Sequence, residues 1–169
     1  IELLGKGREL ADDLGQDVVA VLLGDNIKGL TDNLISHGAD RVIVVDHPML
    51  KEYVTEPYAK AVAMIIDKYD PEIVLYGATS IGRDLAPRLA ARVHTGLTAD
   101  CTGLDIDEES KNLLMTRPAF GGNLMATIVC ADFRPQMATV RPGVMQPIEN
   151  DESRTGEVIE EDAGFTDAD

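Results

Sequence analysis

The sequence of 169 residues contains no tryptophan, and only 4% of its residues are aromatic. A hydrophobic core must therefore be built from aliphatic side chains, and the hydrophobic content of 44% is sufficient for one. No apolar run approaches the roughly 20 residues that a membrane-spanning helix requires. We therefore expect one domain of ordinary size that does not insert into a membrane.

Cysteine and histidine are also scarce. Cys101 and Cys130 are far apart and form no C-x-x-C motif, which favours reduced, mostly buried thiols in a cytosolic protein. His37, His47 and His94 do not have the spacing of metal ligands, so no metal site is predicted.

Basic residues are fewer than acidic residues in this sequence. The 15 lysines and arginines face 30 aspartates and glutamates, and the net charge of −15 argues against nucleic acid and anionic membranes as partners. Residues 149–169 hold nine acids and one arginine with few large apolar residues, so we expect an acidic linker or tail there. The run Gly156–Glu160 is still suited to pair as an edge strand, in this chain or on another.

One stretch, Pro71–Arg92, combines several local signals. The apolar run Ile73–Tyr76 predicts a strand buried on both faces, which Gly77 ends. Thr79 or Ser80 then follows as a cap for the next helix. A strand, a glycine turn and a helix N-terminus form a natural anion site, and Arg83 and Arg88 add cations near it.

The glycines of this stretch do not match a known phosphate loop. Gly77 and Gly82 have the G-x-x-x-x-G spacing of a P-loop, but Arg83 and Asp84 stand where Lys and Ser or Thr are needed. The dinucleotide fingerprint G-x-G-x-x-G is also absent. An anion site and a purely structural turn therefore remain equally open.

The apolar patterns predict an α/β fold with three layers, α/β/α, and a mainly parallel sheet. Continuous apolar strands separated by helices are typical of such a sheet, and antiparallel strands in the second half are expected at one end of it. The expected helices are Ile1–Leu14, Ile27–His37, Tyr53–Tyr69 and one that begins between Thr79 and Gly82; the expected strands are Asp17–Leu23, Arg41–Val45, Ile73–Tyr76, Thr98–Asp107, Leu113–Phe120, Leu124–Cys130 and Met137–Arg141.

The expected order of elements begins with a helix, whereas such a domain normally begins with a strand. We therefore expect residues 1–148 to form an α/β domain that lacks its first strand. An unpaired sheet edge would then favour self-association or marginal stability.

A second candidate segment is Thr116–Asn123, where an arginine, a proline and a Gly121–Gly122 turn could hold a ligand by backbone donors. A hairpin turn explains this pattern equally well. Ser80 lies outside a G-x-S-x-G motif, and nothing in the sequence pairs Asp84 or Asp100 with a nucleophile.

Four segments are specific when taken together and in order. They are Glu2–Ala11 (ELLGKGRELA), Gly77–Ala90 (GATSIGRDLAPRLA), Thr116–Asn123 (TRPAFGGN) and Thr139–Gly143 (TVRPG). They resemble the N-terminal domain of the electron transfer flavoprotein alpha subunit, and the resemblance covers nearly the whole chain. The fold that it implies is similar to that of adenine-nucleotide hydrolases.

The resemblance implies a partner and cofactors. The alpha subunit pairs with a beta subunit of similar fold, and the pair carries FAD as an electron carrier rather than as an enzyme. It passes electrons between acyl-CoA or other flavin dehydrogenases and an acceptor. The main FAD site of the alpha subunit lies in a C-terminal domain that is absent from this sequence. In members that bifurcate electrons from NADH, a second FAD lies in the beta subunit and NAD binds at the subunit interface.

Together, the resemblance and the anion-site pattern predict a cofactor-binding site near the subunit boundary of a cytoplasmic, prokaryotic protein, with no catalytic residue. The expected binding residues are Gly77, Thr79, Ser80, Gly82, Arg83, Arg117, Phe120, Gly121, Gly122 and Asn123. Two alternatives from other classes are a stand-alone adenine-nucleotide-binding module and a small hydrolase or transferase. The first lacks a Gly-rich phosphate loop and the second lacks a nucleophile–base pair.

Overall fold

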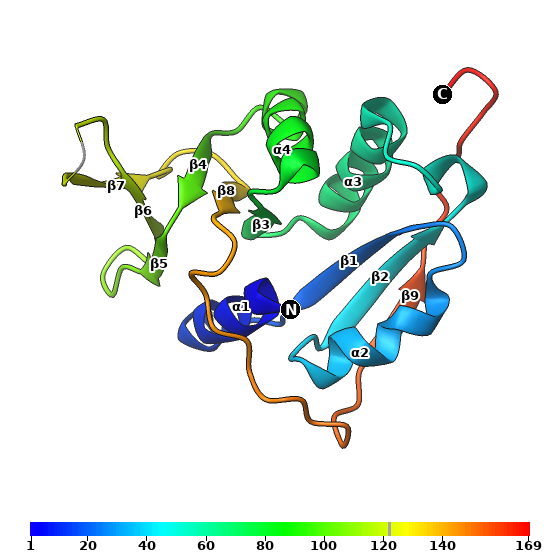
Figure 1. The fold of residues 1–169 in the computed structure, drawn as a ribbon, viewed down its shortest axis with the longest axis horizontal. Coiled ribbons are helices and arrows are strands. Elements are labelled where there is room, and N and C mark those ends of the chain that lie inside the picture. The colour runs from blue at the N-terminus through cyan, green and yellow to red at the C-terminus, as the bar shows by residue number, and fades with distance from the viewer. Residues whose placement is uncertain (122) are drawn as a thin grey trace.

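The structure is a computed structural model that describes residues 1–121 and 123–169 (Figure 1). Its helices are α1 (Glu2–Leu14), α2 (Thr31–Ser36), α3 (Thr55–Tyr69) and α4 (Ser80–Arg92), with the short 3₁₀ helices η1 (Lys28–Leu30) and η2 (Pro48–Leu50). Its strands are β1 (Val19–Gly24), β2 (Arg41–Asp46), β3 (Ile73–Gly77), β4 (Leu97–Cys101), β5 (Gly103–Ile106), β6 (Leu113–Pro118), β7 (Met125–Val129), β8 (Gln136–Val140) and β9 (Glu157–Glu160).

Helices cover both faces of the parallel strands, with α3 and α4 on one side and α1 and α2 on the other (Figure 1). On the α1–α2 side, Leu4 and Ile35 pack with Val42 of β2. On the other side, Val62 of α3 and Leu89 of α4 share a cluster with Met137 of β8. This arrangement confirms the predicted three-layer α/β/α fold with an aliphatic core. Within the described residues, no helix is both long and apolar enough to span a membrane.

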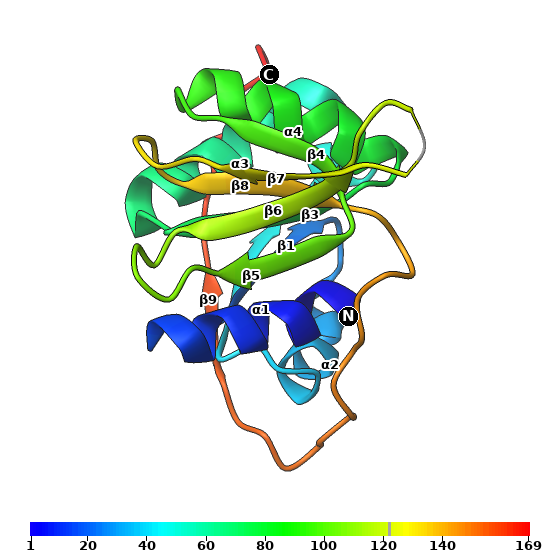
Figure 2. The ribbon, with the colours of Figure 1, turned by 90° about the vertical axis from the view of Figure 1, so that its left-hand side faces the viewer.

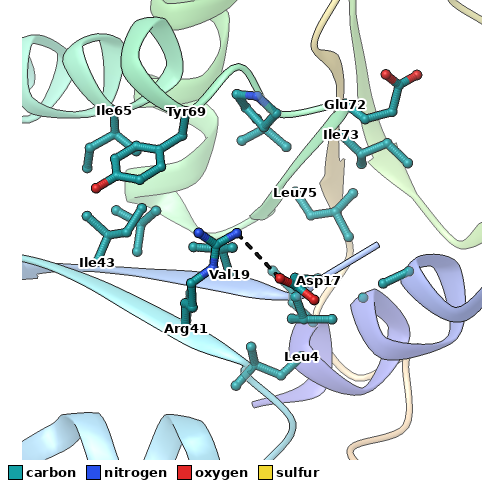
Figure 3. A pocket seen from close by; sticks show the side chains of 18 of the residues that line it. Leu4, Asp17, Val19, Arg41, Ile43, Ile65, Tyr69, Glu72, Ile73 and Leu75 are labelled. Atoms are coloured by element: carbon teal, nitrogen blue, oxygen red, sulfur yellow. Dashed lines mark hydrogen bonds and ion pairs between the residues drawn. The ribbon is translucent and has the colours of Figure 1, made fainter. Parts of the chain in front are cut away.

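The parallel strands form two sheets of three strands, in the orders β1-β2-β9 and β3-β8-β4. A cavity of about 960 Å³ lies between β1 and β3 (Figure 3). The strand predicted at Ile73–Tyr76 is present as β3, but the prediction that it is buried on both faces is wrong. All five of its residues are only half-buried, because the strand borders this cavity.

The second half of the chain differs from the prediction in two respects. The segment Met137–Arg141 was expected among antiparallel strands, but it forms β8, which lies between β3 and β4 and is parallel to both. All five residues of β8 are buried, as befits a central strand. The expected strand Thr98–Asp107 is divided into β4 and β5, which belong to different sheets.

Antiparallel strands do occur, in the separate sheet β5-β6-β7. Figure 2 views this sheet face-on, with α1 below it and α4 above it. Figure 1 shows the β6–β7 hairpin extending away from the helices at the edge of the molecule. The N–H of Ala119 donates to the carbonyl of Leu124 at 2.8 Å and closes the hairpin.

The acidic segment near the end of the chain packs against the domain. Strand β9 pairs with β2 in parallel, so the edge strand predicted at Gly156–Glu160 forms within this chain. Beyond it, Ala163 is buried and the ring of Phe165 lies 4.9 Å from the ring of His47.

Candidate functional site

The turn from β3 to α4 exposes a helix N-terminus. Thr79 has an extended backbone, and its hydroxyl oxygen accepts a hydrogen bond from the N–H of Gly82 at 3.2 Å. Thr79 is therefore the N-cap of α4, and Ser80 is the first residue of the helix. Both side chains are exposed, so the positive end of the helix dipole faces solvent.

The two glycines of the turn lie against each other. A Cβ atom on Gly82 would lie 1.8 Å from the carbonyl oxygen of Gly77, which no side chain tolerates. The G-x-x-x-x-G spacing thus has a structural cause in the close packing of the turn. This packing neither requires nor excludes an anion at the helix N-terminus.

Arg83 is fixed at this turn by a backbone contact. Its Nε donates to the carbonyl of Ala78 at 3.1 Å, which holds the side chain beside the end of β3. Arg88, one turn further along α4, instead pairs with Glu56 of α3 at 2.6 Å. Of the two arginines expected near the turn, the structure holds Arg83 there.

Asp100 forms the centre of a cluster of arginines. Two nitrogens of Arg141 donate to its two carboxylate oxygens, at 3.2 and 2.6 Å. The hydrogen bond from Arg141 lowers the pKa of Asp100, and the charges of Arg141, Arg83 and Arg117 lower it further. Asp100 has a left-handed φ of 58° at an irregularity in β4, and its N–H donates to Thr139 at 2.8 Å.

The cluster lies where the parallel strands end. Gly77 ends β3, Asp100 is one residue from the end of β4, and Arg141 directly follows β8. Because these three strands are parallel, their carboxyl ends share one edge of the sheet, which is where ligands usually bind in α/β folds. The charges of three arginines act on the single carboxylate of Asp100, so its surroundings are locally positive in a chain of net charge −15.

The structure brings together only part of the predicted site. The charge of Arg117 on β6 contributes to lowering the pKa of Asp100, whereas Gly77, Thr79, Ser80, Gly82 and Arg83 lie together in the β3–α4 turn. The β6–β7 hairpin extends away from α4 (Figure 1). Phe120, Gly121 and Asn123 are exposed there, and Gly122 lies outside the described residues.

Two residues of the cluster were not predicted from the sequence as binding groups. The sequence shows no partner for Asp100, and it marks Arg141 only as part of the Thr139–Gly143 segment. Their pairing depends on the irregularity in β4 and on β8 lying beside it, which no local pattern reveals. That segment was nevertheless the available signal for Arg141.

The chemistry of this edge suits binding of an anion rather than proton transfer or nucleophilic attack. The lowered pKa of Asp100 makes its carboxylate a weak base. Burial raises the pKa of the Cys101 thiol to about 11, so the neighbouring thiol is protonated at neutral pH. Among residues 1–121 and 123–169, no group of three or more His, Cys, Asp or Glu side chains could hold a metal ion.

Comparison with known proteins gives a family match over nearly the whole chain. Residues 1–165 match the model of the electron transfer flavoprotein domain. The chain is 61% identical, over all of its 169 residues, to electron transfer flavoprotein subunit alpha of Thermoanaerobacterium thermosaccharolyticum, of which it covers 51%. The corresponding subunit of Clostridium acetobutylicum is 56% identical over 95% of this chain and 48% of that protein.

A third relative is named as a subunit of a dehydrogenase. Subunit LctC of the lactate dehydrogenase (NAD(+),ferredoxin) of Acetobacterium woodii is 53% identical over 83% of this chain and 33% of that protein. The chain thus spans about half or less of the length of these relatives.

Proposed function

Because the chain belongs to the electron transfer flavoprotein domain family, we propose that it is the N-terminal domain of an alpha subunit that pairs with a beta subunit. In that pair it helps to form the binding site of a flavin or of NAD. The observation that carries this proposal is the arginine cluster of Arg83, Arg117 and Arg141 beside the α4 N-terminus.

The residues of this edge fit the phosphate groups that FAD and NAD share. The first-turn N–H groups of α4 and the positive end of its dipole favour an anion, and arginine binds phosphate oxygens through two N–H groups at once. Arg83 is held at the turn, whereas Asp100 orients Arg141 through two hydrogen bonds. When bound, the flavin supplies the electron-accepting ring, and the residues of this chain hold and orient the phosphates.

The nicotinamide cofactor is supported by one relative. The name of the Acetobacterium woodii protein carries NAD(+) and ferredoxin, and its subunit LctC is 53% identical to this chain. We therefore place NAD among the cofactors that the cluster could bind at the subunit interface. The complete complex would act as an electron carrier for acyl-CoA or other flavin dehydrogenases, with bifurcation of electrons from NADH as its most elaborate activity.

The β6–β7 hairpin offers a surface for the beta subunit. Its exposed apolar side chains are Phe120, Leu124, Met125, Ile128 and Val129. Clustered exposed apolar residues on one element are typical of a protein–protein contact. We infer that these side chains contact the beta subunit in the pair.

The experiment compares two arginines of α4 in the full-length alpha subunit paired with its beta subunit. Replacing Arg83→Ala removes a charged hydrogen-bond donor from the cluster, which should weaken NADH binding or FAD retention roughly tenfold or more. Arg88→Ala is the matched control, because Arg88 lies on the same helix but pairs with Glu56. Cofactor content, NADH titration and electron-transfer rates are the measurements.

Normal FAD content, NADH affinity and electron transfer in the Arg83→Ala heterodimer would refute the assignment of the cluster to cofactor binding. Failure of the 169-residue chain to bind a beta subunit, together with ATP or AMP binding by the chain alone, would favour a nucleotide-binding module instead.

A further inference from the structure

The cavity between β1 and β3 is bordered by the edges of both strands. It is lined by every residue of Val19–Leu23 in β1 and of Ile73–Tyr76 in β3. Successive side chains of a strand point to opposite faces of its sheet, so a cavity on one face would touch alternate residues only. Contact with consecutive residues shows that the strand edges themselves face the cavity. Figure 3 shows the side chains of Val19, Ile73 and Leu75 among those that line it.

In β1, the backbone N–H and C=O groups of three residues point toward the cavity. The carbonyl groups of Val18 and Gly24 accept hydrogen bonds, at 2.8 and 2.9 Å, from the residues immediately before and after β2. Consecutive residues of an extended strand direct their N–H and C=O groups to opposite edges. The even-numbered residues therefore face β2, and the backbone groups of Val19, Val21 and Leu23 face the cavity.

The backbone of β3 does the same from the opposite side. The carbonyl of Glu72 and the N–H of Ala78 bond to the first and last residues of β8, at 2.9 and 2.8 Å. The even-numbered residues therefore face β8, and the backbone groups of Ile73, Leu75 and Gly77 face the cavity.

The facing edges of β1 and β3 carry backbone groups that a segment lying between the two strands could bind on both of its sides. Within the part of the chain that the structure describes, β1 pairs only with β2 and β3 only with β8. Backbone N–H and C=O groups at such positions normally have hydrogen-bond partners. The apolar side chains of Val19 and Val21 are 37% and 42% exposed, although central parallel strands are normally covered on both faces.

The position of α1 indicates how the occupant connects to the chain. The carboxylate of Glu2 accepts a hydrogen bond at 2.9 Å from the N–H of Gly143, three residues after β8 ends. Helix α1 thus begins at the carboxyl edge of the sheet, and its last residue, Leu14, leads back to the start of β1. A strand between β1 and β3 that runs parallel to them would end beside the start of α1.

The topology supports the same connection. The path from β1 through α2 to β2 is a crossover between neighbouring parallel strands. A path from the cavity through α1 to β1 moves in the same direction along the sheet, and α1 lies on the same face as α2 (Figure 1). Both crossovers then have the same hand, as parallel sheets require.

We propose that the cavity is the place of one further β-strand, parallel to β1 and β3, which joins the chain at the start of α1. Strand β1 has six residues and β3 has five, so the added strand has five or six. Its side chains are apolar on both faces, because the strand lies between α3 on one side and α1 on the other. This strand would join the two parallel sheets into one.

The test extends the 169-residue chain at Ile1 with a strand of five valines and isoleucines and a linker of four glycines and serines. A matched extension carries proline at the centre of the strand, which lacks an N–H and cannot pair on both edges. Amide exchange measured by NMR should slow at least tenfold at Val19, Val21, Leu23, Ile73, Leu75 and Gly77 with the first extension and not with the second. Ala20 and Val74, which already face β2 and β8, should change less.

Equal exchange in the two extended proteins would overturn the proposal. Protection that appears at the outer edges β9 or β4 instead would also overturn it. Protection that rises with protein concentration would assign the cavity to a strand of a second copy. Should the chain alone be unfolded, the same inference requires that the first extension folds it and that the proline extension does not.

Discussion

Gly82 is the residue whose replacement has the most direct structural consequence. In Gly82→Ala, the new Cβ would lie 1.8 Å from the carbonyl oxygen of Gly77, so the backbone of the β3–α4 turn must move. We expect a loss of roughly 2–4 kcal/mol in the free energy of unfolding, as for other strained backbone positions. Urea denaturation followed by circular dichroism measures this loss.

Gly29 provides the control for this substitution. It is exposed, and a Cβ built on it has no heavy atom within 4 Å among the described residues. Gly29→Ala should therefore stay within about 0.5 kcal/mol of the natural chain. If both variants lost the same stability, the close approach of Gly82 to Gly77 would not be the cause.

Asp100 should give the chain a pH-dependent part of its stability. Its pKa is lowered by Arg141, so the ionised form is favoured in the folded state over the unfolded one. That contribution is fully present above the unfolded pKa of about 3.9 and is lost as the pH falls through the lowered folded value. Asp100→Asn should therefore lower the melting temperature at pH 7, and this difference should shrink progressively below about pH 4.

Asparagine suits this position, because it tolerates the left-handed φ of 58° better than most residues do. The comparison therefore isolates the charge. In an Arg141→Met background the substitution Asp100→Asn should have a smaller effect at pH 7, since the paired cation is gone. An unchanged effect in that background would show that Arg141 is not the source.

The sequence predicts contiguous residues of the site better than distant ones. Thr79, Gly82 and Arg83 follow one another after a strand, so their neighbourhood could be inferred from the order of residues alone. Asp100 and Arg141 are 41 positions apart and meet only because β4 and β8 are neighbours in the sheet. The left-handed backbone of Asp100 has no signature such as a glycine that could have revealed it.

At the scale of elements, β9 offers a test of strand pairing. The N–H groups of Glu157 and Glu161 donate to carbonyl groups at Asp40 and Val44, so odd-numbered residues of β9 face β2. Ile159→Pro removes an N–H that points at β2 and should cost roughly 2 kcal/mol more than Ile159→Ala. The free energy of unfolding in urea is the measurement.

Val158 is the matched position on the same strand. Its N–H points away from β2, so Val158→Pro should differ from Val158→Ala by much less than the corresponding pair at Ile159. Equal costs of proline at the two positions would mean that β9 does not pair with β2 in solution.

Elements were more predictable than their order in the sheets. Continuous apolar runs and helix stops such as Gly15, which has a φ of 65°, marked most boundaries to within a few residues. The place of β8 between β3 and β4 could not be inferred, because apolar content reports burial and not which strands are neighbours. The same limit explains why β3 was expected to be covered on both faces.

For the whole molecule, net charge opposes self-association, whereas unpaired strand edges favour it. The net charge of −15 repels other copies, whereas the facing edges of β1 and β3 and the exposed Val19 and Val21 favour association. Salt weakens only the first effect, because the screening length falls from about 10 Å at 0.1 M to about 3 Å at 1 M. The chain without a partner should therefore self-associate more as salt rises, as sedimentation velocity at several protein concentrations would detect.

Two variants that each add one negative charge test whether self-association involves the edges of β1 and β3. Val21→Glu places a carboxylate on β1 beside the cavity and should suppress association, as inward charges do on natural edge strands. Leu30→Glu adds the same charge at an exposed position at the end of η1, so it should act only through net charge and be overcome by salt. If both variants behaved alike, association would not involve the β1–β3 edges. A monodisperse monomer with a high melting temperature at all salt concentrations would mean that these edges are satisfied without an added strand.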